Sequence, residues 1–191
     1  MNFMPQAIPD VLVIELEFHK DERGYFTETF REDKLSEAVG RNINFVQENE
    51  SKSTKGVLRG LHFQSPPFAQ SKLVRVIDGA VLDVAIDIRK GSPNYGQYVS
   101  VELSSINKKQ VFIPRGFAHG FLVLSESVTF SYKVDNYYSA NHEHGLAYND
   151  HEINIDCQVE KEQLVLSKRD VQQPKLKELN EFFLYDQNYY E

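Results

Sequence analysis

The chain has 191 residues, enough for one domain with a sizeable core, and 41% of them are hydrophobic. Its formal net charge of −7 argues against a general nucleic-acid-binding protein, because such proteins usually carry a basic surface. The single cysteine, Cys157, cannot form a disulfide within the chain, so we expect a reducing, cytoplasmic setting. We expect no secretion signal and no membrane association, because no apolar run approaches the ~20 residues of a membrane-spanning helix.

Short segments rich in β-branched and aromatic residues follow one another and predict an all-β protein. We expect strands at 11–18 and 25–30 around a turn at 21–24, and then a short helix at 32–39 that ends at Gly40. The pair Asp78-Gly79 predicts a hairpin. Further strands are expected at 45–47, 56–63, 72–78, 80–88, 98–103, 110–113, 120–124 and 128–134.

The C-terminal tail, residues 171–191, has a different pattern. Pro174 opens a helical repeat that places apolar residues on one side, and this predicts a C-terminal helix. These residues are Leu176, Leu179, Phe182 and Phe183. Short strands without long helices between them favour a sandwich or barrel over βαβ units. No internal repeat or linker is present, so we expect one domain over residues 1–191.

A cation and a histidine interrupt the expected strand at 56–63, in the sequence Arg59-Gly60-Leu61-His62. Burying such groups costs free energy unless a charged or reactive partner uses them, so this strand indicates a pocket for an anionic ligand and a proton transfer. A strand histidine is more often structural, but Gly60 leaves room beside this imidazole. By strict alternation Arg59 and His62 lie on opposite faces, so both reach one pocket only if the strand bulges near Gly60.

Three further residues have both a structural and a chemical interpretation. Tyr132 falls on the apolar face of its strand, where it is either a core tyrosine or a proton donor with an ordinary pKa of about 10. Lys72 begins its strand as a solvated end or as an ammonium that stabilises an enolate oxygen. His119 either bonds backbone groups in a turn or assists at the same site.

The sequence argues against a metal centre. Small double-stranded barrels often bind metal through a His-x-His pair, and Gln64 stands where the second histidine of such a pair would be. His142 and His144 form another His-x-His pair, but Glu143 is the only nearby carboxylate, so a metal site there is the weaker alternative. No glycine-rich phosphate loop and no Ser–His–Asp arrangement is present.

A series of segments occurs in the order and approximate spacing of a known family. They are 21–24, 45–49, 59–64, 72–76, 83–89, 113–121, 132–133 and 166–170. On these motifs the chain closely resembles the dTDP-4-dehydrorhamnose 3,5-epimerase family, from about Ile8 to about Pro174. The resemblance implies a cupin-type jelly-roll barrel or sandwich, a homodimer, and no metal or organic cofactor.

The resemblance also implies roles for individual residues. His62 corresponds to the general base, oriented by Asp170, and Tyr132 to the acid on the opposite face of the sugar. Lys72 corresponds to a group near the C4 oxygen of the substrate. The positions that match substrate contacts are Arg23, Glu28, Gln47, Glu48, Asn49, Arg59, Lys72, His119, Tyr138, Glu143 and Arg169.

Some of these positions carry further expectations. Tyr138 matches the residue that stacks on thymine. Arg169 stands where the family usually has a lysine near the phosphates, and either cation can serve there. His144 stands where many relatives have arginine, which leaves a phosphate contact from that loop in question. Whether Arg23 serves its own pocket or that of a partner subunit is open.

The activity implied is inversion of C3 and C5 of dTDP-4-dehydro-6-deoxy-D-glucose to give dTDP-4-dehydro-L-rhamnose, for dTDP-L-rhamnose synthesis and cell-surface polysaccharide. The nearest alternative is an enzyme that inverts only one centre of a related dTDP-4-keto-6-deoxy sugar. More distant alternatives are a ketoisomerase, a non-catalytic dTDP-sugar-binding cupin and a metal-dependent dioxygenase. The missing His-x-His pair argues against the last of these.

Overall fold

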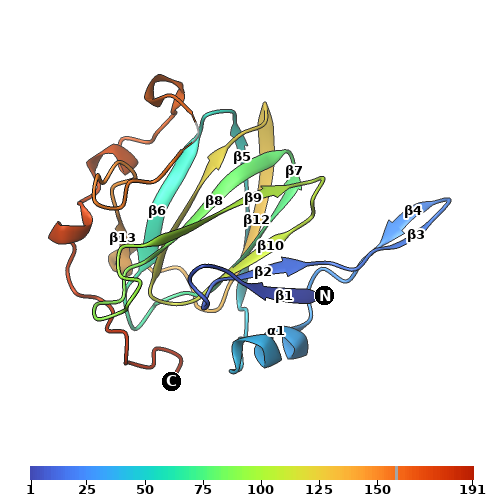
Figure 1. Ribbon diagram of the computed structural model, residues 1–191, viewed down its shortest axis with the longest axis horizontal. Helices are drawn as coiled ribbons and strands as arrows, with labels where there is room; N and C mark the ends of the chain where they lie inside the picture. Colours follow the sequence, from blue (N-terminus) through green and yellow to red (C-terminus); the bar gives the residue numbers. More distant parts are fainter. Residues whose placement is uncertain (158) are drawn as a thin grey trace.

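Two antiparallel sheets face each other as a sandwich in the computed structural model, which describes residues 1–157 and 159–191 (Figure 1). One has the spatial order β1 (Asn2–Pro5), β2 (Leu12–Glu15), β10 (Gln110–Ile113), β7 (Lys72–Asp78), β12 (Ser127–Val134), β5 (Gln47–Thr54). The other has the order β13 (Glu143–Gly145), β6 (Leu58–Gln64), β11 (Phe117–Val123), β8 (Ala80–Asp87), β9 (Tyr98–Ser104). The all-β, cupin-type prediction is confirmed as a sandwich whose sheets do not close into a barrel.

The main hydrophobic core lies between the sheets. Val76 and Phe130 reach it from one sheet, and Ala85 and Phe121 from the other. The rings of Phe121 and Phe130 stack with centroids 4.1 Å apart, which joins the sheets directly. Since side chains alternate along each strand, the same alternation carries polar residues into the space between the sheets where the apolar core ends.

Two elements lie outside the sandwich. The helix α1 (Glu32–Val39) begins and ends where the sequence predicts, and Gly40 caps it in the left-handed conformation. Its Leu35 packs on a second apolar cluster outside the six-stranded sheet, together with Leu12 and Phe112. The strands β3 (His19–Asp21) and β4 (Gly24–Phe26) form a hairpin arm that projects from the body (Figure 1).

The hairpin predicted at Asp78-Gly79 is wrong. β7 and β8 belong to different sheets, so the chain crosses from one layer of the sandwich to the other at Gly79. The apolar faces of both strands bury themselves in the same core from opposite sides, as Val74 and Val81 do. Two consecutive strands that each have an apolar face can form a hairpin or can lie in opposite sheets of a sandwich. Tertiary packing decides between these two arrangements.

The strand boundaries differ from the prediction mainly where the sequence is polar. β5 extends over Gln47–Thr54, whereas only residues 45–47 were expected, because this edge strand pairs on one side with β12 and exposes alternate side chains. The short strands β1, β3 and β13 were not predicted. β2 ends at Glu15 and β4 at Phe26, before the predicted ends.

The predicted C-terminal helix is wrong. The tail contains only single 3₁₀ turns, η3 (Asp170–Gln172) and η4 (Leu176–Glu178), like η1 (Ala140–His142) and η2 (Lys161–Gln163) earlier in the chain. Its backbone makes only isolated turns and also bonds to other parts of the chain. Ala147 donates to the carbonyl of Pro174, and Lys90 donates to that of Phe183, both at 2.8 Å. The apolar residues of the tail cover the outer face of the five-stranded sheet as an extended strap.

Among the described residues, no helix is long and apolar enough to cross a membrane.

Candidate active site

A cavity of about 340 Å³ lies between the sheets and combines a histidine–carboxylate pair with a lysine and a tyrosine. A second hollow of about 340 Å³ shares His62, Lys72 and Tyr132 with it and continues outward. Larger hollows occur elsewhere on the chain but do not contain this group of residues. The residues that line the first cavity are Ser51, Arg59, His62, Lys72, His119, Phe121, Phe130, Tyr132, Ser167, Arg169 and Asp170.

His62 and Asp170 form a tightly held pair, although 108 positions separate them in the sequence. Nε2 of His62 lies 2.6 Å from Oδ1 of Asp170, and the hydroxyl of Ser167 donates to Oδ2 at 2.8 Å. Both carboxylate oxygens are therefore engaged, which fixes the orientation of the imidazole. Burial lowers the pKa of His62 below its usual value even though the Asp170 charge acts in the opposite direction, so the neutral ring predominates at neutral pH.

A bulge in β6 brings Arg59 to the same cavity as His62. His119 pairs with His62 and Phe121 with Arg59, so β6 places two residues between these pairs where β11 places only Gly120. The extra residue reverses the alternation, as the bulge expected near Gly60 requires. Gly60 adopts φ +124°, and a Cβ there would lie 2.7 Å from the Cα of Gly120. Glycine is thus the residue that this close approach of the β6 and β11 backbones accepts.

Lys72 extends from the opposite sheet into the cavity. Its ammonium donates to the backbone carbonyl of His62 at 3.3 Å. Burial lowers the pKa of Lys72 to about 8, while the carboxylates of Asp83 and Glu143 act in the opposite direction. The lysine is therefore a cation at neutral pH whose charge is poorly solvated, and such a cation stabilises a nearby developing anion strongly.

Tyr132 faces the cavity from β12, one alternation beyond Phe130 on the inward side of the strand. Burial raises the pKa of Tyr132 above its usual value of 10. The phenol is therefore protonated throughout the neutral range. Because His62 lies on the five-stranded sheet and Tyr132 on the six-stranded sheet, the two groups approach a molecule in the cavity from different sides.

The structure adds a second histidine–carboxylate pair that the sequence analysis missed. Nε2 of His119 lies 2.8 Å from Oδ2 of Asp83, and both side chains are almost fully buried. Asp83 lies behind His119 and does not line the cavity itself. A lone carboxylate within the apolar run of β8, Val81 to Ile86, was the signal that could have indicated it.

Ser51 is another residue that the sequence analysis missed. Its hydroxyl is buried at the cavity wall and has no hydrogen-bond partner among the described residues. Buried polar groups rarely remain without a partner, so this oxygen is suited to a polar group of a bound molecule. The inward alternation of β5, which places Asn49 and Ser51 on one face, was the available signal.

Polar and aromatic residues surround the outer hollow. Tyr138 donates to Oε2 of Glu143 at 2.7 Å, and Arg169 donates to the same oxygen at 2.6 Å. Although burial acts in the opposite direction, these two hydrogen bonds hold the pKa of Glu143 below its usual value. On β5 of the other sheet, Gln47 donates to the side chain of Asn49 at 2.8 Å. The exposed ring of Tyr138 is available to stack on a planar group.

Three residues expected to contact the substrate lie away from this cavity. Arg23 is at the tip of the hairpin arm, with its side chain 83% exposed. Glu28 and Glu48 line a different hollow, on the outer face of the six-stranded sheet. Alternation along β5 turns Glu48 away from Asn49, and its carboxylate accepts a hydrogen bond from Lys133 at 2.6 Å. The chain does not bring these three residues to its own cavity.

Among the described residues, no group of three or more histidine, cysteine, aspartate or glutamate side chains is arranged to hold a metal ion. The His-x-His pair of the sequence is used in packing. His142 bonds to the hydroxyl of Ser139, and His144 bonds to Ser65 and packs on the ring of Phe182.

Comparison with known proteins shows similarity to one family of sugar epimerases. The model of the dTDP-4-dehydrorhamnose 3,5-epimerase family matches residues 5–178. A dTDP-4-dehydrorhamnose 3,5-epimerase of Shigella flexneri is 50% identical over 95% of this chain and 99% of its own. A dTDP-6-deoxy-D-glucose-3,5-epimerase of Legionella pneumophila, solved in complex with dTDP-4-keto-L-rhamnose, is 43% identical with a TM-score of 0.93, over 97% of this chain and 99% of its own. A dTDP-4-dehydrorhamnose 3-epimerase of Streptomyces niveus is less similar, 37% identical over 82% of this chain and 75% of its own. The chain belongs to the dTDP-4-dehydrorhamnose 3,5-epimerase family.

Proposed function

We propose that the protein inverts C3 and C5 of dTDP-4-dehydro-6-deoxy-D-glucose and gives dTDP-4-dehydro-L-rhamnose. The observation that carries this proposal is the single cavity in which His62, paired with Asp170, and Tyr132 extend from opposite sheets. The greater identity to a relative named as a 3,5-epimerase than to one named as a 3-epimerase supports inversion of both centres.

The first step is removal of a proton from carbon. The C4 ketone acidifies the hydrogens on C3 and C5, because the resulting carbanion delocalises into an enolate. His62 keeps its proton on Nε2, where it donates a hydrogen bond to Asp170, and Nδ1 is left free to accept the proton from carbon. Asp170 then stabilises the imidazolium that forms. A positioned base of this kind contributes about 10²–10⁴ in rate.

Two groups on the opposite sheet complete the reaction. The ammonium of Lys72 stabilises the negative charge that develops on the C4 oxygen. Tyr132 then donates its phenolic proton to the enolate carbon from the other face, which inverts the centre. Solvent returns a proton to Tyr132 and removes one from His62, so the enzyme is restored without any redox change.

The nucleotide is held where the cavity opens outward. Arg59 and Arg169 line the cavity wall and supply guanidinium groups for the diphosphate. Tyr138 supplies an exposed ring on which the thymine stacks, and Gln47 and Asn49 supply amides around it. In this arrangement the sugar lies inside the sandwich and the base lies at its edge.

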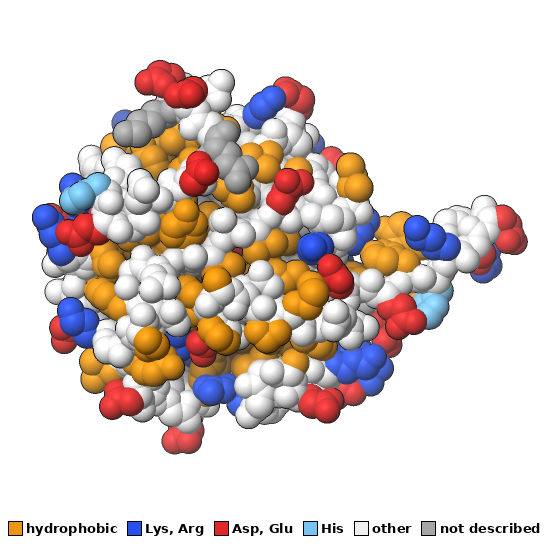
Figure 2. Space-filling model, viewed as in Figure 1, with side chains coloured by type: hydrophobic (Ala, Val, Ile, Leu, Met, Phe, Trp, Pro, Cys, Tyr) orange, Lys and Arg blue, Asp and Glu red, His pale blue; other side chains and the backbone are white. Residues whose placement is uncertain are grey.

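We also propose a homodimer in the cytoplasm, in which the hairpin arm serves a neighbouring subunit. The arm stands clear of the body and carries charged side chains at its end (Figure 2). Tyr25 and Phe26 on the arm are 55% and 67% exposed, which is costly for aromatic rings on an isolated chain. An arm that reaches a second copy covers these rings and brings Arg23 to the partner's nucleotide. The single cysteine, Cys157, supports the cytoplasmic setting.

The decisive experiment is incubation with the 4-keto-6-deoxy-glucose nucleotide in heavy water. We expect deuterium at both C3 and C5 and a product with both centres inverted, as followed by NMR. His62→Ala should reduce exchange at both positions by about 10² or more, whereas His151→Ala, at an exposed histidine outside the cavity, should not change it.

Each other outcome supports a different function for this protein. Exchange and inversion at one position indicate a single-centre epimerase. Binding of dTDP without any exchange indicates a non-catalytic sugar-binding protein. Wild-type exchange by His62→Ala removes His62 from the role of base.

A further inference from the structure

The C-terminal tail reaches a partly buried polar cluster, which we call the tail cluster (Ser71, Arg115, Asp135, Tyr189, Tyr190). The hydroxyl of Tyr190, the residue before the last, lies 2.7 Å from Oγ of Ser71 and accepts a hydrogen bond from the backbone N–H of Arg115 at 3.0 Å. Ser71 is fully buried. These contacts tie the tail to the body of the fold.

Side chains of the tail cluster connect several parts of the fold. Oδ1 of Asp135 accepts a hydrogen bond from the backbone N–H of Ser71 at 2.6 Å, and Oδ2 accepts one from Arg115 at 3.1 Å. The guanidinium of Arg115 also donates to the backbone carbonyl of Tyr189. The loops before β7, before β11 and after β12 therefore meet at one point, and the tail closes the network.

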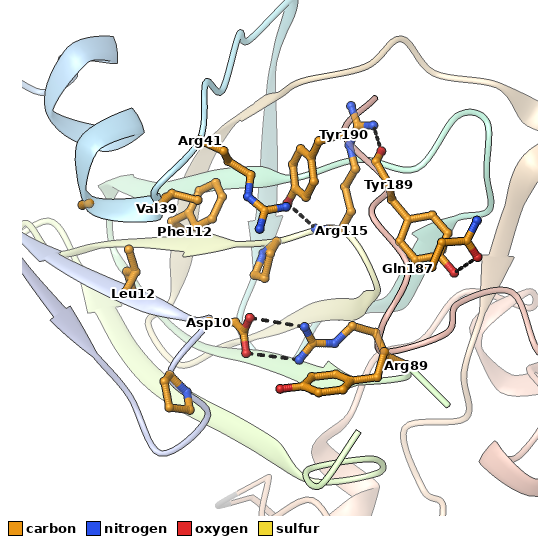
Figure 3. A pocket seen from close by; sticks show the side chains of 14 residues that line it. Asp10, Leu12, Val39, Arg41, Arg89, Phe112, Arg115, Gln187, Tyr189 and Tyr190 are labelled. Carbon is orange, nitrogen blue, oxygen red and sulfur yellow. Dashed lines mark hydrogen bonds and ion pairs between the residues drawn. The ribbon is translucent and has the colours of Figure 1, made fainter. Parts of the chain in front are cut away.

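Arginine side chains on both sides hold the ring of Tyr190. The guanidinium carbons of Arg41 and Arg115 lie 4.5 Å and 4.9 Å from the ring centroid (Figure 3). Such cation–π contacts attract the guanidinium groups to the faces of the ring and hold it in place. Burial raises the pKa of Tyr190, so its hydroxyl stays protonated and keeps its hydrogen bonds. The ring and its hydroxyl are thus fixed in one place.

The tail cluster adjoins two of the residues assigned to the reaction. Lys72 directly follows Ser71 in the chain, and Tyr132 lies three residues before Asp135. In the sheet Lys72 is the register partner of Val134, so the start of β7 and the end of β12 lie side by side. Beside them Gln70 donates to the carbonyl of Asn136 at 2.8 Å. Contacts that fix the position of Ser71 therefore also fix the Cα position of Lys72, from which its side chain extends.

We propose that Tyr190 is a positioning residue that acts through Ser71 to hold Lys72 in the catalytic cavity. This inference rests on the proposed function, because Lys72 is the group assigned there to the C4 oxygen. The family match ends at residue 178, so Tyr190 lies in a part of the chain that the family model does not include.

The charge state of Lys72 reports its position. The titratable groups around it are His62 and Arg59 on β6, Asp83 on β8, His119 on β11, Tyr132 on β12, Glu143 on β13, and Arg169 and Asp170 near η3. Burial lowers the pKa of Lys72 against the attraction of Asp83 and Glu143. If the start of β7 loosens, water reaches the ammonium, and its pKa moves upward toward the usual value of 10.5.

The test is Tyr190→Phe, which removes one hydroxyl and keeps the ring. We expect kcat to fall about fivefold with KM little changed, the ratio that corresponds to one net hydrogen bond. In protein labelled with ¹³C-lysine, the Lys72 Cε resonance, assigned with Lys72→Arg, should titrate at higher pH than in the wild type. Ser71→Ala removes the same hydrogen bond from its other side and should give the same shift.

Tyr189→Phe is the matched control. Among the residues that the structure describes, its hydroxyl bonds only within the tail, to Leu184 and Gln187, so kcat and the Lys72 titration should stay as in the wild type. A Tyr190→Phe protein with wild-type kcat and Lys72 titration overturns the proposal, even if it melts at a lower temperature. The NMR titration needs no turnover, so it tests the role of Tyr190 even if the wild type shows no exchange, a result that refutes only the proposed function.

Discussion

Burial favours the protonation states that the proton-transfer roles of His62 and Tyr132 require, and it opposes the charged state that the role of Lys72 requires. Burial acts against charge, so it favours the neutral imidazole of His62 and the neutral phenol of Tyr132. The same effect weakens the hold of Lys72 on its proton and brings its pKa to about 8. The chain thus obtains a base, an acid and a cation at neutral pH in one cavity.

These pKa directions predict a bell-shaped pH profile. The rate should fall as the pH drops through the pKa of His62, which lies below 6.5, because the protonated ring cannot accept a proton. It should also fall above about pH 8, because Lys72 loses its charge there. Tyr132 should not limit the rate in this range, since its pKa lies above 10. Measurement of kcat/KM from acid to alkaline pH gives both limbs.

Lys72→Arg distinguishes the origin of the alkaline limb. Arginine keeps its charge at every accessible pH, so the limb near pH 8 should disappear even if the rate is lower overall. The acid limb should remain, because His62 is unchanged. An alkaline limb that stays in place in this variant would assign it to a group other than Lys72.

At the scale of elements, the sequence predicts what local chemistry decides. Helix α1 follows from its apolar spacing and Gly40, and the cavity-facing side of β6 follows from a histidine beside glycine. The crossing from one sheet to the other at Gly79 and the extended course of the tail depend on which distant segment forms hydrogen bonds with the backbone. No local sequence pattern contains that information. Asp83 escaped notice because its partner His119 lies on another strand.

The bulge in β6 makes a prediction at this scale. Gly60→Ala places a methyl group 2.7 Å from the Cα of Gly120 and 2.8 Å from the carbonyl of His119, at a positive φ that costs about 1–2 kcal/mol by itself. Because backbone atoms on both strands must move, we expect destabilisation of more than about 2 kcal/mol in urea unfolding, together with loss of activity in the folded fraction.

Gly91→Ala is the control for conformational strain alone. Gly91 also has a positive φ, but a Cβ there meets no atom within 4 Å. It should cost only about 1–2 kcal/mol and leave turnover intact. If the two substitutions lowered stability and activity equally, the close approach of β6 and β11 at Gly60 would tolerate a side chain, and the bulge would not depend on glycine.

At the scale of the whole molecule, the site needs both sheets and the segment that carries Ser167, Arg169 and Asp170, yet Arg23, an expected substrate contact, stays outside it. His62 and Lys72 come from opposite layers of one chain and reach the same cavity. Arg23 is carried away from that cavity on an arm with exposed Tyr25 and Phe26. A closed two-fold dimer would solve both problems, because each arm would cover its rings on the partner and complete the partner's site.

This arrangement predicts complementation between two defective proteins. We expect Arg23→Glu and His62→Ala to be impaired as separate proteins. If they are unfolded and refolded together in equal amounts, half of the dimers should be mixed, and each mixed dimer should contain one site with both residues intact. Activity should then return to about a quarter of the wild-type level. His62→Ala refolded with Lys72→Ala is the control, since both residues belong to the same chain's cavity and every site keeps a defect. Recovery with neither pair, in a protein shown to be dimeric, would mean that Arg23 does not complete the site of its partner.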